Sequence, residues 1–374
     1  MKSAKLIIDS PEKNSSLLYS TGYFCIDPII YLEVDSVKIG YFPATEFEKA
    51  KKTSTLSIIE NLSEKIKEYN AINKSNILKS TLLIDKLKSM EITDIIVPES
   101  FPSIEFINLT KNGFCVQCKK EPFFESRTIK TSLEQNCIKD VSNKTVSVMD
   151  AVKTIIAEST INNNTLLYKD VILTAEYLQN FILKSFIDVG LSADAVIVSV
   201  GDQGCDPHER GYGPILPYTS IIVDIFPRSR SHYYFSDMTR TFCKGQASNE
   251  LNKLYNDVKE IQQKLLDTVK PGITGKDVHK ITVDFFDSKG YKSGVINGYL
   301  QGFMHGTGHG LGLDCHELPF VSSTGEVLEE NTVITIEPGL YYKGIGGVRL
   351  EDTVVVKKDG VEVLTGYEKI LEIP

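Results

Sequence analysis

The stretch FMHGTGHGLGLDCHE, residues 303–317, holds three of the six histidines of this 374-residue chain, together with four glycines. His305 and His309 have the i, i+4 spacing of a helical metal-ligand pair, but glycines at this density disfavour a helix. Glycine instead permits close backbone approach and unusual dihedral angles, so the segment can hold an imidazole against a metal ion. We therefore expect His309 to be a metal ligand, with His305 and His316 in the outer shell or facing a substrate.

Four predicted strands in the second half of the chain each carry an acidic residue among apolar or β-branched neighbours. These acids are Asp224 in SIIVDIF, Asp237 in DMTRTF, Glu337 in VITIEPG and Glu351 in VRLEDTV. Side chains two apart on a strand share a face, so each acid can point to a common side. Burying four uncompensated carboxylates together is costly, and Arg349 supplies one positive charge. The sequence therefore predicts a site for two divalent metal ions.

Length and composition limit the classes of protein to consider. A chain of 374 residues exceeds the size of about 250–300 residues at which a single core stops growing, so we expect two domains. The net charge of −8 argues against a nucleic-acid partner. We expect no membrane-spanning helix and no secretory signal, because the apolar runs are too short. Seven scattered cysteines indicate no disulfide framework, so a cytoplasmic location is the simplest expectation.

The first part of the chain alternates strand and helix signals, which is typical of an α/β module. Within it, SIIENLSEKIKEYNAI (57–72) has the apolar spacing of a helix. The sequence around 138–165 becomes polar and asparagine-rich, which suits a linker plus a connecting helix. We therefore expect an N-terminal α/β domain at 1–145 and a second domain at 146–374.

The second domain alternates helices with strands that carry polar residues on one side. This pattern indicates an α+β domain with a curved, mostly antiparallel sheet. His279 falls on one of the helices, where we expect a partly exposed surface histidine. The expected strands cover residues 195–200, 220–226, 237–242, 333–337 and 348–356.

Taken together, these motifs resemble the pita-bread metallopeptidases, the family of prolidase, aminopeptidase P and methionine aminopeptidase. The resemblance covers residues 150–374 and rests on Asp224 and the motifs SDMTRT, HGTGHGLGLDCHE, TIEPGLY and GGVRLED. It extends weakly to SSLLYSTGYF (15–24), which is similar to a stretch in the N-terminal domain of prolidases. It implies a pita-bread catalytic domain preceded by a smaller creatinase/prolidase-like α/β domain.

The resemblance also implies how the ligands are shared between two metal ions. Asp224 and Asp237 would hold one ion, His309 and Glu337 the other, and Glu351 would bridge both, with Asp237 also bridging. Hydrolysis in such a site proceeds by a hydroxide that the two ions share. Glu337 would then pass a proton to the leaving nitrogen. Manganese is the metal we expect, with cobalt, zinc or iron as alternatives.

Residues around the ligands receive roles by the same resemblance. His305 and His316 would steady the substrate and the developing oxyanion. His208 would gate the substrate, Arg349 would fix the bridging glutamate, and Tyr341 would hydrogen-bond within the site. The family further implies a homodimer.

An N-terminal domain in front of the catalytic one favours the prolidase and aminopeptidase P branch. The expected substrates are dipeptides or short peptides with proline in second position, cleaved at the Xaa-Pro bond. A Xaa-Pro aminopeptidase rather than a dipeptidase is the alternative, and a non-catalytic pita-bread binding module is another. A cation that captures a dipeptide's carboxylate would separate the first two, and Arg228 and Arg230 are the candidates. They lie in the enlarged segment 225–236 between the first two ligands.

Overall fold

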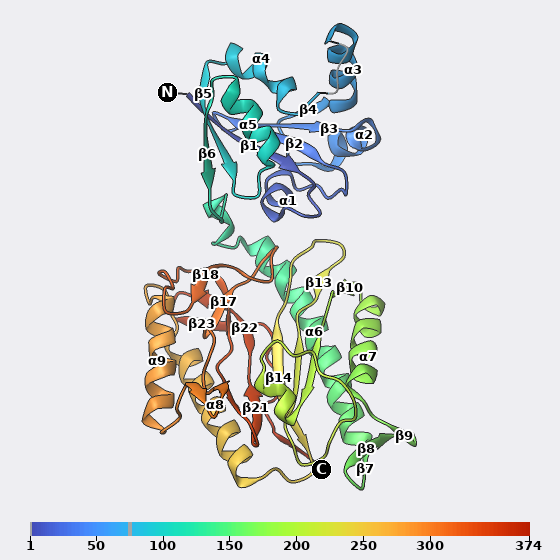
Figure 1. Ribbon diagram of the computed structural model, residues 1–374, viewed down its shortest axis with the longest axis vertical. Helices are drawn as coiled ribbons and strands as arrows, with labels where there is room; N and C mark the ends of the chain where they lie inside the picture. Colours follow the sequence, from blue (N-terminus) through green and yellow to red (C-terminus); the bar gives the residue numbers. More distant parts are fainter. Residues whose placement is uncertain (1, 74–76) are drawn as a thin grey trace. The chain divides into compact units, whose positions relative to one another are not determined.

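The computed structural model describes residues 2–73 and 77–374, and the chain divides into two compact units, Met1–Arg127 and Thr128–Pro374 (Figure 1). The first unit is an α/β module around a six-stranded mixed sheet in the order β4-β3-β2-β1-β5-β6. Its strands are β1 (Lys2–Asp9), β2 (Ile29–Val34), β3 (Val37–Phe42), β4 (Ile58–Asn61), β5 (Ile92–Pro98) and β6 (Cys115–Lys119). Its helices are α1 (Ser15–Thr21), α2 (Ala44–Thr53), α3 (Leu62–Asn73), α4 (Thr81–Ser89) and α5 (Ser103–Lys111).

Both faces of this sheet are covered. Along β1, Leu6 and Ile8 pack into one hydrophobic cluster and Ile7, which points the other way, packs into another. Residues buried on both faces of a sheet form a continuous apolar run, which explains the stretch LII at 6–8. The α/β architecture predicted for the N-terminal part of the chain is therefore present.

The helix expected over 57–72 is wrong at its beginning. Ile58 lies opposite Ile39 in the parallel pairing of β4 with β3. Helix α3 begins only at Leu62, because the Asn61 side chain accepts hydrogen bonds from the backbone amides of Ser63 and Glu64. Apolar spacing alone did not distinguish these four strand residues from a helical turn.

The second unit begins with the long helix α6 (Ser132–Glu158), which contains residue 145, the expected domain boundary. A capping box between Thr131 and Glu134 fixes the start of the helix. Its buried positions, among them Val141, Val148 and Val152, recur at helical spacing and pack into the core of the second unit. Ser142 and Thr145 of the polar stretch are buried within this helix, and the asparagines at 162–164 follow its end. The division between the units falls earlier, between Arg127 and Thr128.

The sheets of the second unit are mostly antiparallel, as predicted. One has the order β11-β12-β14-β24 and the other β18-β17-β19-β22-β23, and only the β14–β24 pairing among these described strands is parallel. The strands of the first sheet are β11 (Ile197–Val200), β12 (Ile221–Ile225), β14 (Met238–Lys244) and β24 (Glu372–Ile373). Those of the second are β17 (Gly308–Gly310), β18 (Glu317–Val321), β19 (Val333–Ile336), β22 (Asp352–Lys357) and β23 (Gly360–Val363).

Small ribbons complete the unit. They are β7 (Thr160–Asn162) with β8 (Thr165–Tyr168) and β9 (Val171–Ile172), β10 (Leu191–Ser192) with β13 (Arg228–Ser229), β15 (Gly294–Ile296) with β16 (Tyr299–Gln301), and β20 (Gly339–Tyr342) with β21 (Gly346–Arg349). Helices α6 and α7 (Ala175–Asp188) pack on one side of the strands, and α8 (Asn249–Thr268) and α9 (Gly275–Ser288) on the other (Figure 1). The strands between them are held from both sides.

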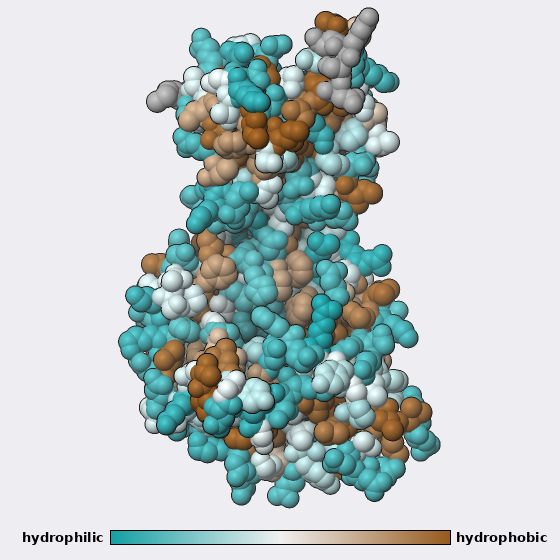
Figure 2. All heavy atoms as spheres, in the orientation of Figure 1, coloured by the Kyte–Doolittle hydropathy of each residue, from teal (hydrophilic) through white to brown (hydrophobic). Residues whose placement is uncertain are grey.

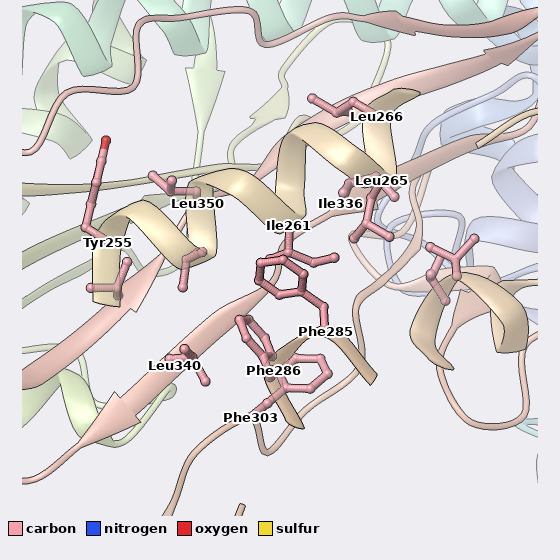
Figure 3. Packing of buried hydrophobic residues seen from close by; sticks show 14 of the residues in the cluster. Tyr255, Ile261, Leu265, Leu266, Phe285, Phe286, Phe303, Ile336, Leu340 and Leu350 are labelled. Atoms are coloured by element: carbon pink, nitrogen blue, oxygen red, sulfur yellow. The ribbon is translucent and has the colours of Figure 1, made fainter. Parts of the chain in front are cut away.

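The core beneath α8 and α9 is connected to the histidine segment through an aromatic contact. Figure 3 shows Ile261 and Leu265 of α8 above Phe285 and Phe286 of α9. The ring of Phe303, the first residue of the quoted stretch, meets Phe286 at 5.4 Å between centroids, at an angle of 61°. The glycine-rich segment is thus anchored by a buried aromatic side chain at its start.

Polar side chains cover most of the surface that Figure 2 shows. The hydrophobic side chains on this face lie in separate patches. Among the helices of residues 2–73 and 77–374, none is long and apolar enough to cross a membrane.

Substituting Phe286 with alanine should lower the free energy of unfolding by about 3–5 kcal/mol, because the change leaves a cavity in a closely packed aromatic cluster. Urea unfolding of the metal-free protein measures this. Ile187→Ala, on the exposed side of α7, is the control and should change stability by less than about 0.5 kcal/mol. Equal effects of the two substitutions would contradict the packing described.

Candidate metal centre

One cavity of about 390 Å³ in the second unit is lined by all five residues that the sequence predicts as metal ligands. They come from separate elements. Asp224 lies on β12, Asp237 directly before β14, His309 on β17, Glu337 directly after β19 and Glu351 between β21 and β22. All five therefore lie at strands or strand ends that surround one space.

The ligand atoms are close together and shielded from solvent. His309 Nε2 lies 3.8 Å from Asp237 Oδ2 and 3.4 Å from Glu337 Oε1. One ligand atom each of Asp237, His309 and Glu351 falls within 4.8 Å of the others, and all three residues are buried. Asp224 is buried as well, with 7% of its surface exposed.

These carboxylates disfavour one another's charged forms. Burial, followed by the charge of Asp224, raises the pKa of Asp237 well above its usual range, and burial with the charge of Asp237 does the same to Glu351. Burial raises the pKa of Glu337 to about 7, with Asp224 adding to the rise and Arg349 opposing it. Without further positive charge the site cannot hold all its acids ionised at neutral pH.

The donor set fits divalent cations. Asp224 Oδ1 and Asp237 Oδ1 are buried and have no hydrogen-bond partner within the part of the chain that the structure describes. Buried carboxylate oxygens of this kind are expensive unless something satisfies them. His309 Nδ1 lies 3.1 Å from the Gly310 carbonyl oxygen, to which it donates. Its Nε2 lone pair is then directed toward the acids, as a metal ligand requires.

The residues on either side of His309 must be glycines, because a larger side chain there would clash with the neighbouring backbone. A Cβ at Gly308 would lie 2.0 Å from the carbonyl oxygen of Thr335, on the neighbouring strand β19. The close approach lets the Thr335 hydroxyl accept a hydrogen bond from the His309 amide at 3.0 Å and donate one to Glu337 Oε1 at 3.2 Å. The histidine and the glutamate are thus fixed through one side chain.

Arg349 makes a different connection from the one implied by the family resemblance. It donates to Asp224 Oδ2 at 2.6 Å and to the Tyr341 hydroxyl at 2.9 Å. Its contact with Glu351 is indirect: the Arg349 Nε donates to Thr239 Oγ1 at 3.2 Å, and this hydroxyl donates to Glu351 Oε2 at 2.6 Å. Arg349 therefore neutralises and orients Asp224 first.

Three histidines surround the predicted ligands, and His305 is the one whose two ring nitrogens both have hydrogen-bond partners within the described chain. Its Nδ1 donates to the Gly306 carbonyl at 2.7 Å, and its Nε2 accepts from the Tyr341 hydroxyl at 2.9 Å. Burial lowers the pKa of His305 to about 3, so the ring is neutral. His208 and His316 are exposed at the rim of the cavity, with the His316 ring 4.2 Å from that of His309.

Two residues near the site did not emerge from the sequence. Cys315 lines the cavity, and its thiol donates to Asp237 Oδ2 at 3.3 Å. The sequence did contain a signal for Cys315, because it directly precedes His316 in the stretch that carries the predicted site residues. His279 is half-buried, in agreement with the partly exposed histidine expected, but its contacts were not predicted: Nδ1 lies 3.0 Å from Thr307 Oγ1 and the ring 5.4 Å from that of Phe303.

The two arginines considered for capturing a peptide carboxylate do not line the cavity. Arg228 lies over the rings of Tyr233 and Phe235, at 5.7 and 5.8 Å. Arg230 is exposed. The enlarged segment between the first two ligands contributes Phe226 to the cavity wall instead.

Comparison with known proteins identifies the class to which this fold and ligand set belong. Residues 136–358 match metallopeptidase family M24, and this match covers more than half of the chain. The chain belongs to metallopeptidase family M24, a family of peptidases that use divalent metal ions.

Curated relatives are also named as peptidases. A segment of 180 residues is 46% identical to an uncharacterized peptidase of Staphylococcus aureus strain USA300, and 181 residues are 43% identical to one of Staphylococcus epidermidis. Each match covers 48% of this chain and 48% of the relative, so the chain spans about half the length of the curated relatives it matches.

Solved structures match over nearly the whole chain. A Xaa-Pro dipeptidase from Bacillus anthracis has a TM-score of 0.82 at 23% identity and covers 100% of this chain and 95% of its own. A prolidase from Pyrococcus horikoshii OT3 has a TM-score of 0.78 at 26% sequence identity, and the match covers 99% of this chain and 95% of the prolidase. An X-Pro aminopeptidase from Thermotoga maritima MSB8 has a TM-score of 0.79 at 22% sequence identity, and the match covers 99% of this chain and 97% of the aminopeptidase. These matches show the predicted two-domain fold, in which an α/β domain precedes the pita-bread catalytic domain.

Adding Mn²⁺ to metal-free protein should raise its thermal stability, because a ligand that binds the folded state adds about 2.7 kcal/mol at 100 times its Kd. Scanning calorimetry measures the shift, and titration calorimetry the stoichiometry, which we expect to be two. Asp237→Asn should remove most of the effect, whereas Asp287→Asn, an exposed acid of the same unit, should keep it. A full shift in Asp237→Asn would contradict the ligand set.

In metal-free protein, Glu337 should reduce stability as the pH rises. Its pKa is about 7 in the folded state against an ordinary 4.5, so its stabilising contribution is complete below pH 4.5 and is lost as the pH rises through about 7. Each pKa unit corresponds to about 1.4 kcal/mol, so the loss amounts to a few kcal/mol.

Because histidines titrate in the same range, the readout is the difference in unfolding free energy between the wild type and Glu337→Gln from pH 5 to pH 8. The wild type should lose stability relative to the variant over this range. A difference that stays constant across it would show that Glu337 is not perturbed.

Proposed function

We propose that this protein is a dinuclear metal-dependent peptidase that hydrolyses the Xaa-Pro bond at the N-terminus of dipeptides or short peptides. The observation that carries the proposal is the cluster of buried acids and His309 at one cavity, with carboxylate oxygens that lack any partner in the described chain. The specificity for proline is supported by the names of the similar structures, among them the prolidase at 26% identity.

The five ligands Asp224, Asp237, His309, Glu337 and Glu351 would hold the two ions. When bound, such ions activate a water molecule and polarise the scissile carbonyl. One imidazole with four carboxylates suits manganese, cobalt, iron or zinc, and we propose manganese because most of the donors are oxygens.

The chain itself supplies positioning and proton transfer. Glu337 lies at the cavity directly after β19, and we propose that its carboxylate takes up a proton and passes it to the leaving nitrogen. His305 is engaged at both ring nitrogens, so we assign it to holding the Tyr341 hydroxyl beside Arg349. That arrangement keeps Arg349 fixed on Asp224.

We propose that the histidines at the rim of the cavity contact the substrate. His316 and His208 both line the cavity and are exposed. Partial desolvation at the cavity wall, followed by the neighbouring His309, lowers the pKa of His316, and a neutral imidazole can donate one hydrogen bond to a carbonyl that gains negative charge. We propose His316 for this role and His208 for contact with the bound peptide. A homodimer and a cytoplasmic location stay predictions from the sequence.

Metal-loaded protein should release the N-terminal residue from Ala-Pro and Ala-Pro-Ala but not from Ala-Ala, measured by chromatography of the products. Glu337→Gln should lower kcat by about 10²–10⁴, because it removes the proton carrier and one ligand. Asp287→Asn is the control and should retain full activity. Protein that binds two metal ions and releases nothing from any Xaa-Pro peptide would instead be a binding module.

A further inference from the structure

A second cavity of about 510 Å³ adjoins the metal cavity. Pro207, His208 and His305 line both, so the two spaces meet at these residues. The remaining walls of the second cavity are formed by Cys205, Asp206, Tyr299, Leu300, Met304 and Lys343. None of these six is needed to hold a metal ion, and the proposed function gives them no role.

The apolar part of this cavity is exposed. Tyr299 is 57% and Leu300 55% exposed, and both belong to β16. Single exposed apolar residues are ordinary on a protein surface. Two adjacent large ones that line a cavity continuous with a catalytic cleft form the apolar wall that ligand-binding sites typically have.

Among the residues that the structure describes, the metal cavity has no free lysine or arginine to receive a peptide's C-terminal carboxylate. Among the described residues that line it, Arg349 is the one arginine or lysine. It is 4% exposed, and its donors are directed to Asp224, Tyr341 and Thr239. A dipeptide would place its carboxylate one residue beyond the scissile bond, beside acidic ligands and without a free positive side chain.

The second cavity does offer a cation, the exposed side chain of Lys343. The Lys343 ammonium donates to the Asp202 carbonyl at 2.9 Å and lies over the Tyr299 ring at 5.6 Å from the centroid. Its backbone amide donates to Gln301 Oε1 at 2.8 Å. An ammonium has three donors, so two remain after the contact with Asp202. The opposing acid at this cavity, Asp206, accepts a hydrogen bond from the His208 backbone amide.

We propose that the peptide downstream of the scissile bond extends from the metal cavity into the second cavity. The third residue of the substrate places an apolar side chain against Tyr299 and Leu300, and the carboxylate of a tripeptide pairs with Lys343. This inference rests on the proposed function and makes the preferred substrates peptides of three or more residues. The enzyme is then an aminopeptidase rather than a strict dipeptidase.

The test compares kcat/KM of the metal-loaded enzyme for Ala-Pro, Ala-Pro-Gly, Ala-Pro-Leu and Ala-Pro-Leu-amide. Ala-Pro-Leu should exceed Ala-Pro by at least about tenfold, because burying a leucine side chain contributes about that factor or more. Leu300→Ala should reduce the preference for leucine over glycine. Ile187→Ala, a similarly exposed residue outside both cavities, should leave it unchanged.

Lys343→Ala should lower kcat/KM for Ala-Pro-Leu by about two- to fivefold, the range of an exposed ion pair, and leave the amide unaffected. Lys358→Ala, an exposed lysine of the same unit, is the matched control. Equal rates on the dipeptide and the tripeptides would overturn the inference while leaving the Xaa-Pro activity intact. So would a Leu300→Ala enzyme whose preference changes at the first residue instead of the third.

Binding provides a readout that does not depend on turnover. Titration calorimetry with the metal-loaded protein should show that the product Pro-Leu binds more tightly than proline, and that Leu300→Ala removes the difference. If Pro-Leu and proline bind equally, the second cavity does not receive the downstream residue, whether or not the protein proves to be a peptidase.

Discussion

The burial of four carboxylates around one imidazole is the constraint on which the rest of the catalytic unit depends. Each acid raises the free energy of its neighbours' charged forms, and burial removes the water that would screen them. Arg349 relieves part of the repulsion by pairing with Asp224, and it reaches Glu351 through Thr239. One guanidinium cannot balance four acids, so the site is organised to receive further positive charge.

The surrounding elements stabilise this arrangement, because helices and neighbouring strands pack against the strands that carry the acids and His309. Strands that carry the acids are packed between α6 with α7 and α8 with α9, and the histidine segment is anchored by Phe303 against Phe286. Glycines let β17 approach β19 closely enough for Thr335 to hold both His309 and Glu337. Ligands fixed in advance lose little conformational entropy when a metal ion binds.

In the proposed enzyme, the residues for the chemistry and those for substrate selection lie in different places. Buried groups face the metal cavity, whereas exposed His208 and His316 form its rim and Tyr299, Leu300 and Lys343 line the adjoining cavity. We expect the length of the substrate to be selected by these exposed residues, because in the proposed site they take no part in holding a metal ion.

The sequence by itself indicated the family and the α/β plus α+β architecture, and it singled out five residues that line one cavity, because strand alternation and glycine spacing are local properties. It misplaced the start of α3 and the domain boundary, since β4 is defined by pairing with β3 and α6 by packing of its apolar side. Only the tertiary structure decided which partners meet across the sheets. Arg349 with Asp224, Cys315 with Asp237 and His279 with Thr307 are separated by 125, 78 and 28 positions, and no local pattern specifies such pairs.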